Sequence, residues 1–504
     1  MAFSRHLSHL SALALLALAA SGLNGCTRKS ESATRIAVIG DTAAPWHDPW
    51  TPAARATTAG RLLADSLGEG LVAFDAEGKV VPGLADRWIV ADDGQSYIFR
   101  LRGAAWADGG QMNTESVRQG LRAAIAAQKD KPLSAALSAI EDIRAMTGRV
   151  IEIRLSRPMP QFLPLLALPE LALPPRQHLA GPMALKAEGA DALLTALPPE
   201  KRGLPSVEDW GRTARPLYLS VMPAAQAIAA FNAGKLDVVL GGSFTDLPPV
   251  GHGPLSGGPL GKGGLKLDPV VGLFGLVVEN EDGLLAHAAN REALSMAIDR
   301  ASLTTQIGVP GWQGTTRLIA PGSEADTGMV IERWADMDLE GRRTLASQRI
   351  AQWARVSGQG AHLRIALPSG AGGDALAVLL QSSFAAIGVS VQRVDLRAPA
   401  DLRLIDEVNG EPSPDWFLQR FGCALHPHAC SPAADGLTHQ ALEAPDPASA
   451  KPLFAQAERA LLNENVFLPL GAPVRWSLVS GESQGFALNR WGLHSLLPMA
   501  IRAR

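Results

Sequence analysis

The sequence predicts a mixed α/β fold, and three observations carry this prediction. The chain has 504 residues, 47% of them hydrophobic, so it is long enough to bury large cores and to form two to four domains. Its 50 glycines and 36 prolines indicate many turns between short elements. Strand patterns also alternate with amphipathic helix patterns along the chain, which is typical of α/β proteins.

The predicted elements follow one another in a regular order. Residues 35–40, RIAVIG, form a branched apolar run that ends in glycine and predicts a buried strand. Residues 96–102 alternate apolar and polar side chains, as a half-buried strand does. Residues 114–127 carry apolar side chains at helical spacing, with Thr114 as the candidate N-cap. Further patterns predict a helix in 58–74, two strands and a helix in 143–167, a helix and a strand in 224–242, and a strand-helix-strand unit in 363–392.

The N-terminus reads as an export signal. A basic start at Arg5 is followed by an uncharged apolar run over residues 10–23. This run is shorter than the ~20 apolar residues that a bilayer requires, and it fits the core of a signal peptide. Residues 23–26, LNGC, resemble the lipobox of bacterial lipoproteins, which implies cleavage before Cys26 and a diacylglycerol anchor on its thiol. The alternative is an ordinary signal peptide that happens to contain a cysteine.

Two further cysteines, Cys423 and Cys430, enclose the stretch CALHPHAC. In an exported protein such a local pair predicts a disulfide. His426 and His428 between them leave a zinc site as the alternative, because cysteine and histidine are the ligands that zinc prefers. Four ligands within eight residues would make a cramped tetrahedron, so the disulfide is the preferred interpretation.

An ordered series of short motifs runs through the first quarter of the chain. Its members are Asp48-Pro49, Glu69-Gly70-Leu71, Gly78, residues 82–85 (PGLA), Trp88, residues 92–94 (DDG), residues 97–102 (YIFRLR), Trp106, Asp108-Gly109 and residues 114–117 (TESV). This series resembles the N-terminal signature region of the family 5 extracellular solute-binding proteins, the oligopeptide-, dipeptide- and nickel-type receptors of ABC importers. Weaker similarity continues through 224–242, 290–303, 320–323 and 363–392, and so covers nearly the whole mature chain.

The resemblance implies a periplasmic-binding-protein-like α/β fold (type II, cluster C). Such a fold has two lobes, an additional domain and a ligand cleft between the lobes. One of its three domains is assembled from separated segments. The expected boundaries are 1–25 for the signal peptide, 26–34 for the tether, 33–55, 182–268 and 466–504 for domain I, 56–181 for domain II, and 269–465 for domain III.

Tryptophan supplies the first candidate ligand contacts. The chain has eleven tryptophans and two tyrosines, and large rigid rings suit a cleft that holds a ligand by shape and apolar area. Trp46 and Trp50, which follow the first predicted strand, and Trp416 are the candidates. Trp88 and Trp106 belong to the signature motifs and are expected to be structural.

The second group of candidates surrounds Trp416. Peptide-binding members of the family carry a segment W-x-A-D-Y, whose acidic side chain pairs with the α-ammonium group of the ligand. Here the corresponding stretch places Gln419 at the acidic position and Arg420 at the tyrosine position, while Asp415 stands as a displaced substitute. An arginine at the cleft favours a ligand with a carboxylate or a phosphate. The alternative is that Arg420 is a structural or surface residue.

Several function classes find no support in the sequence. A net charge of −3 without a basic stripe argues against nucleic acid as a partner. Neither His-Glu-x-x-His nor Gly-x-Ser-x-Gly is present, and SGGPLGKGG only approaches a phosphate-binding loop. No enzymatic activity, cofactor or metal is therefore expected.

The resemblance implies a monomeric, lipid-anchored receptor that binds a small molecule or peptide and delivers it to an ABC permease. Its expected location is the periplasmic side of the envelope. Thr27 is not the aspartate of the best-known inner-membrane retention signal, which favours the outer membrane. The alternatives are an envelope scaffold or sensor of the same fold and, with less support, an exported hydrolase.

Overall fold

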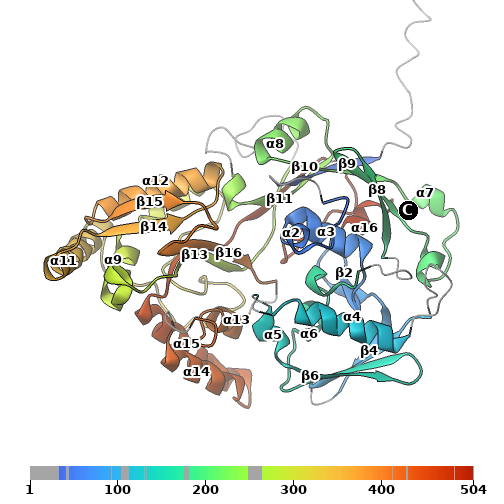
Figure 1. The fold of residues 1–504 in the computed structure, drawn as a ribbon, viewed down its shortest axis with the longest axis horizontal. Helices are drawn as coiled ribbons and strands as arrows, with labels where there is room; N and C mark the ends of the chain where they lie inside the picture. The colour runs from blue at the N-terminus through green and yellow to red at the C-terminus, as the bar shows by residue number, and fades with distance from the viewer. Residues whose placement is uncertain are drawn as a thin grey trace, which may run out of the picture. The chain divides into compact units, whose positions relative to one another are not determined.

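The structure is a computed structural model (Figure 1). It describes residues 33–40, 45–91, 94–103, 113–129, 131, 133–174, 181–247, 264–410, 413–426, 430–481 and 483–502. The signal peptide, Cys26, nearly all of the tether and Trp106 lie outside the described residues. Among the described helices, none is both long enough and apolar enough to cross a membrane.

A seven-stranded mixed sheet has strand β1 (Thr34–Ile39) at its centre. β1 pairs in parallel with β10 (Leu217–Met222) and β11 (Val238–Ser243), and the outer strands are antiparallel. Those outer strands are β8 (Met183–Glu188), β9 (Asp191–Ala196), β12 (Leu265–Leu267) and β18 (Arg475–Val479). The strands thus come from the three chain segments expected to form domain I.

The sequence of β1 is apolar throughout its interior because both of its faces are covered. Ile36 and Val38 join a core cluster that includes residues of helix α3 (Thr58–Leu67). Ala37 and Ile39 join a second cluster with residues of α8 (Ala224–Asn232). A strand buried on both faces reads as a continuous hydrophobic run, which is why the sequence predicted it correctly.

The segment 56–181 contributes an antiparallel sheet of four strands in the order β4-β5-β7-β6. These strands are β4 (Ala85–Val90), β5 (Ser96–Leu101), β6 (Ile140–Met146) and β7 (Val150–Leu155). A hairpin of β2 (Val72–Phe74) and β3 (Val80–Pro82) precedes them, and α4 (Thr114–Ala126), α5 (Ser134–Leu137) and α6 (Phe162–Leu166) accompany them.

Two local features of this segment bear on the sequence predictions. β5 buries Tyr97 and Phe99 and exposes Ile98, so it is the half-buried strand expected from the alternation. The expected N-cap of α4 is wrong by one residue: the side chain of Asn113, not Thr114, accepts the hydrogen bond from the amide of Ser116 at 2.7 Å. Asparagine in an extended conformation is as good an N-cap as threonine, and here it comes first.

A five-stranded sheet has the order β15-β14-β16-β13-β17, and Figure 1 labels all of its strands except β17. Its strands are β13 (Gly272–Val278), β14 (His362–Ala366), β15 (Ser390–Val394), β16 (Leu402–Val408) and β17 (Phe467–Gly471). β17 pairs with β13, so this sheet extends beyond residue 465, the expected end of domain III. The long helices of this part are α9 (Ala288–Ala297), α10 (Arg300–Ile307), α11 (Leu339–Ser357), α12 (Ala371–Ala385), α14 (Pro432–Leu442) and α15 (Pro447–Glu464).

A buried ion cluster links several of the signature motifs. The carboxylate of Glu69 accepts hydrogen bonds from both terminal nitrogens of Arg102, and Arg102 also donates to the carbonyl of Gly83 at 2.7 Å. Arg202 approaches the same carboxylate at 3.4 Å. Buried charges are tolerated when they are paired in this way, so these motif residues are structural.

Candidate functional site

A small cavity lies where the three expected domains meet, and its volume is about 80 Å³. One wall comes from α5, the chain after β7, and α6; another comes from the end of β16 and from α13 (Pro414–Gln419). A third contribution is Trp491, near the C-terminus. The lining residues are Leu133, Ala136, Arg157, Met159, Gln161, Leu165, Leu168, Asn409, Ser413, Asp415, Trp416, Gln419, Arg420, Leu425 and Trp491.

The first turn of α13 presents Asp415 to this cavity. The helix begins with Ser413 as its N-cap, in an extended conformation, and with Pro414 at the first helical position. Both residue types are favoured at these positions. The hydroxyl of Ser413 donates to Oδ1 of Asp415 at 2.5 Å, and Nε2 of Gln419 donates to Oδ2 at 3.3 Å. Asp415 is only 8% exposed, and both of these donors are neutral groups. Within the described part of the chain, the carboxylate of Asp415 is therefore held by hydrogen bonds and has no paired cation.

Arg420 follows the same helix, and its charge is already engaged. Nε and one terminal nitrogen donate to the two carboxylate oxygens of Glu407, both at 2.8 Å. This bidentate contact raises the pKa of Arg420. The third nitrogen lies 3.0 Å from Nε2 of His426, and burial together with the positive charge of Arg420 lowers the pKa of that imidazole.

Trp491 joins parts of the chain that are far apart in sequence. Its indole N–H donates to the carbonyl of Gly78 in the β2–β3 hairpin at 3.1 Å, and its ring lies 4.5 Å from that of Phe74. On the other side it packs against Gly410, where a Cβ atom would lie 2.2 Å from the ring. The sequence motifs gave no sign of Trp491, because only the chain topology brings residue 491 to the cavity.

Arg157 is another lining residue that the motifs did not identify. It follows β7 and lies between Leu155 and Met159, both of which are buried. Among the residues that the structure describes, no hydrogen-bond or ion-pair partner of its side chain is found. Arg157 is half-buried, and within the described part of the chain its charge has no counter-ion.

The structure places four of the six expected contact residues together and two elsewhere. Asp415, Trp416, Gln419 and Arg420 all line the cavity. Trp46 is 4% exposed in the core of the seven-stranded sheet, where its indole N–H donates to the carbonyl of Ala190 at 3.0 Å.

Trp50 packs against the same core, and the guanidinium of Arg55 lies 5.4 Å from its ring centroid. Neither Trp46 nor Trp50 lines the cavity.

Cys423 and Cys430 are joined by a disulfide, with their Cα atoms 5.0 Å apart. Sulfur atoms in a disulfide are not thiolate ligands, so this arrangement differs from the zinc alternative. His428 lies outside the described residues, and the described part of the chain holds no group of three or more metal-binding side chains. The disulfide closes the loop that carries His426, the neighbour of Arg420.

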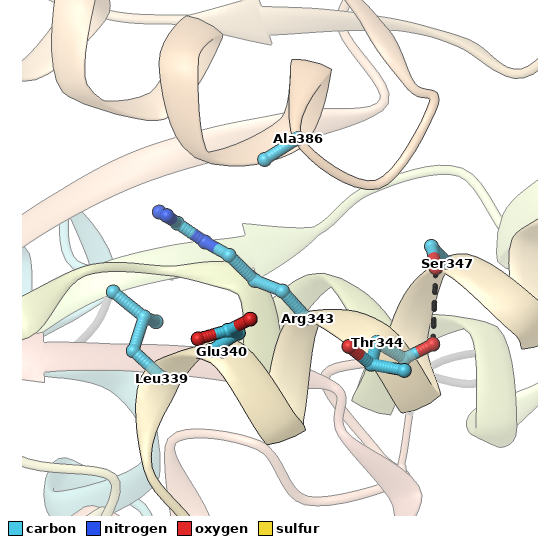
Figure 2. Close-up of a pocket in the computed structure, with 6 residues that line it drawn as sticks. All are labelled: Leu339, Glu340, Arg343, Thr344, Ser347 and Ala386. Carbon is cyan, nitrogen blue, oxygen red and sulfur yellow. Dashed lines mark hydrogen bonds between the residues drawn. The ribbon is translucent and has the colours of Figure 1, made fainter.

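A second hollow lies on α11, away from the cavity. Figure 2 shows Leu339, Glu340, Arg343, Thr344 and Ser347 on α11, with Ala386 facing them from the end of α12. Ser347 donates back to the carbonyl of Thr344 at 3.0 Å, and Arg343 donates to the carbonyl of Ala297 at 3.1 Å. These polar groups satisfy the local backbone, so this hollow offers no convergent binding groups.

The cavity is better suited to binding than to catalysis. Its described lining contains one carboxylate, two guanidinium groups, amides, one hydroxyl and several apolar side chains, but no histidine. The hydroxyl of Ser413 donates its hydrogen bond to the carboxylate of Asp415, and no histidine of the described lining lies beside it. A mostly apolar wall with a few fixed polar groups is the usual composition of a ligand site.

Known proteins share both the sequence pattern and the fold. The model of the bacterial extracellular solute-binding proteins, family 5 Middle, matches residues 79–196. The "Probable deoxycholate-binding periplasmic protein YgiS" of Escherichia coli (strain K12) is 32% identical over 141 residues, which are 24% of this chain and 26% of that protein. The "Probable di/tripeptide-binding protein 5" of Pseudomonas aeruginosa (strain UCBPP-PA14) is 24% identical over 496 residues, with 87% of this chain and 90% of that protein covered.

The solved structure of Haemophilus influenzae OppA in complex with RPPGFSPFR has the same fold. Its TM-score with this chain is 0.78 at 17% identity, and the match covers 94% of this chain and 100% of that chain. The expected two-lobed periplasmic-binding-protein fold is thereby confirmed. The chain is therefore similar to the bacterial extracellular solute-binding proteins of family 5 over residues 79–196, and it shares its fold with the OppA structure over 94% of its length.

Proposed function

We propose that the protein is the solute-binding receptor of an ABC import system. It binds a peptide-like or other small polar solute in the cavity lined by Asp415, Trp416 and Trp491 and delivers it to the permease. The observation that carries this proposal is the position of the cavity, whose walls come from three separated parts of the chain. The relatives named above support the ligand class, since one is named for di- and tripeptides and another for deoxycholate.

The proposed contacts are of two kinds, apolar rings that fit the shape of the ligand and polar groups that form hydrogen bonds with it. Trp416 and Trp491 supply apolar area, and Asp415 and Gln419 supply hydrogen-bonding groups of fixed orientation. Asp415 is the candidate partner of a ligand ammonium group, because the donors now on its oxygens are neutral and weaker. Trp46 and Trp50 belong to a core and are not among the proposed contacts.

Ligand entry in this proposal requires the walls to separate. A volume of about 80 Å³ is well below the ~300–1,000 Å³ of typical ligand pockets. Receptors of this kind bind in an open form and close on the ligand by a hinge motion. Closure strengthens every polar contact inside, because water is excluded from the site.

The same small volume favours a second candidate function, an envelope scaffold or sensor that keeps the fold without transport. In that case the cleft is filled by its own side chains, and no solute is expected to stabilise the protein. The two candidates therefore differ in a single measurable property, the shift in melting temperature with added solutes.

The proposed location follows from the N-terminus. Cleavage before Cys26 and lipidation of its thiol would tether a monomeric receptor to the membrane on the periplasmic side, through residues 26–34. Metabolic labelling with a radioactive fatty acid tests this: wild type is expected to be labelled and to fractionate with membranes. Cys26→Ser should be unlabelled, and labelled Cys26→Ser would contradict the assignment.

The function itself is tested with protein purified from its native host. Native mass spectrometry is expected to show a bound small molecule, and thermal-shift screening of di- to pentapeptides, opines and bile acids should show stabilisation by the same class. The absence of both signals would reject the receptor and favour the scaffold. A bound molecule that is chemically altered by the protein would instead indicate an enzyme.

A further inference from the structure

Three charged side chains line the cavity, and their surroundings differ. Arg420 is paired on two nitrogens with Glu407, so this pair adds little net charge. Asp415 is held by neutral donors at the start of α13, where a helix N-terminus also favours negative charge. Arg157 differs from both, since no partner of its side chain is found in the part of the chain that the structure describes.

The half-buried side chain of Arg157 has apolar neighbours at the cavity. Met159 and Leu165, which also line the cavity, are buried apolar residues. A guanidinium that loses water beside such side chains requires a compensating anion. A planar guanidinium is especially suited to a carboxylate, because it can donate two parallel hydrogen bonds.

The backbone around Arg157 is fixed on both sides. The amide of Ser156 donates to the carbonyl of Ala139 at 2.8 Å. The carbonyl of Met159 accepts from the amide of Phe162 at 3.0 Å and from the hydroxyl of Tyr97 at 2.8 Å. The proline residues at 158 and 160 restrict the chain further. Arg157 is thus presented from a rigid segment, which lowers the entropic cost of binding.

We propose that Arg157 binds a carboxylate of the ligand, and that the natural ligand is a peptide-like or other small polar solute that carries such a group beside apolar substituents. This inference rests on the proposed function, because it takes the cavity to be the ligand site. It assigns the anion contact to Arg157 rather than to Arg420, whose two best-oriented donors are occupied by Glu407.

The test uses two pairs of probes that differ only at the acid. Leu-Phe is compared with Leu-Phe amide, and 4-phenylbutanoate with 4-phenylbutanamide, by isothermal titration calorimetry on the full mature protein. We expect wild type to bind the acid of at least one pair about tenfold or more tightly than the amide, as the loss of charge-assisted hydrogen bonds predicts. Arg157→Gln should bind acid and amide about equally.

Arg154→Gln is the matched control. Arg154 is an exposed arginine on β7, three positions before Arg157, and it does not line the cavity. This variant should keep the wild-type preference for the acid, and thermal unfolding should show that both variants fold. If Arg157→Gln keeps the preference, or if wild type binds acid and amide equally, the inference is wrong while the receptor function stands. If wild type binds no probe of either pair, the inference fails for this ligand class, and the broader screen decides the function separately.

Discussion

Arg420 and Glu407 form a two-pronged ion pair at the edge of the cavity, with both hydrogen bonds 2.8 Å long. The two side chains come from neighbouring parts of the chain, the end of α13 and strand β16. Both are largely shielded from solvent, with side-chain exposures of 18% and 25%. The pair therefore shapes the site without offering it a free positive charge.

Replacing Arg420 should reduce stability and leave ligand selectivity intact. Arg420→Met strands a shielded carboxylate, so we expect the free energy of unfolding to fall by about 1–3 kcal/mol in urea denaturation. The preference for an acid over its amide should remain, because Arg157 is still present. The double variant Glu407→Gln/Arg420→Met should recover part of the lost stability. If Arg420→Met loses the preference for the acid, Arg420 rather than Arg157 binds the carboxylate of the ligand.

Trp491 and Trp46 allow a matched comparison of a cavity residue with a core residue. Each indole donates one hydrogen bond to a backbone carbonyl, at 3.1 Å to Gly78 and at 3.0 Å to Ala190. Substitution by phenylalanine should cost each variant about 1 kcal/mol of unfolding free energy, since one hydrogen bond is lost.

Only Trp491→Phe should also weaken ligand binding severalfold, because only that ring lines the cavity. Calorimetry with the best probe measures this difference. If Trp491→Phe and Trp46→Phe bind the probe with equal affinity, Trp491 does not contact the ligand. If Trp46→Phe binds more weakly than wild type, Trp46 does contact it.

Much of the fold was predictable because its elements have strong local patterns. β1 is a continuous apolar run, and the buried stripe of Leu379, Leu380 and Phe384 marks α12. The pairing of β17, which begins just after the expected boundary at 465, was not predictable, since its partner β13 lies 190 or more residues earlier in the chain. A pairing between such distant segments leaves no local signal in sequence.

The site was predictable only where it lies within one short segment. Asp415, Trp416, Gln419 and Arg420 are neighbours on or beside α13, so a single motif made all four candidates. Arg157 and Trp491 reach the cavity through the topology of the chain, and no motif marks them. Trp46 was a candidate contact but lies in a core. The local sequence around a tryptophan does not distinguish a core position from a position in a cleft.

The signature residue Glu69 should be essential for folding rather than for binding. Glu69→Gln removes the charge that compensates the buried Arg102 and the half-buried Arg202. Breaking a buried ion pair from one side costs about 3–5 kcal/mol, and chemical denaturation should show a loss of this size. Glu115→Gln is the control, because Glu115 pairs with Arg118 on the exposed face of α4 and should stay close to wild type. Comparable losses in both variants would contradict the structural role of the buried cluster.

Asp65 on α3 should make the stability of the protein depend on pH. Its Oδ2 atom is buried without a hydrogen-bond partner in the described part of the chain, and burial raises the pKa of its carboxyl to about 6, against a hydrogen bond from Ser495 that lowers it. The unfolded chain titrates near ~3.9, so between about pH 4 and pH 6 the folded protein binds more protons than the unfolded chain. Stability must then fall as the pH rises through this window.

Removing the charge should remove that fall. Asp65→Asn is expected to gain about 2–3 kcal/mol relative to wild type between pH 4 and pH 7.5, since each pKa unit corresponds to about 1.4 kcal/mol. Urea denaturation of both proteins at the two pH values measures this gain, and taking the difference cancels any pH-independent effect of the asparagine. Asp86→Asn, at an exposed position on β4, should show no such gain. A gain of the same size for Asp86→Asn, or none for Asp65→Asn, would mean that the carboxyl of Asp65 is hydrated in solution and titrates like an exposed acid.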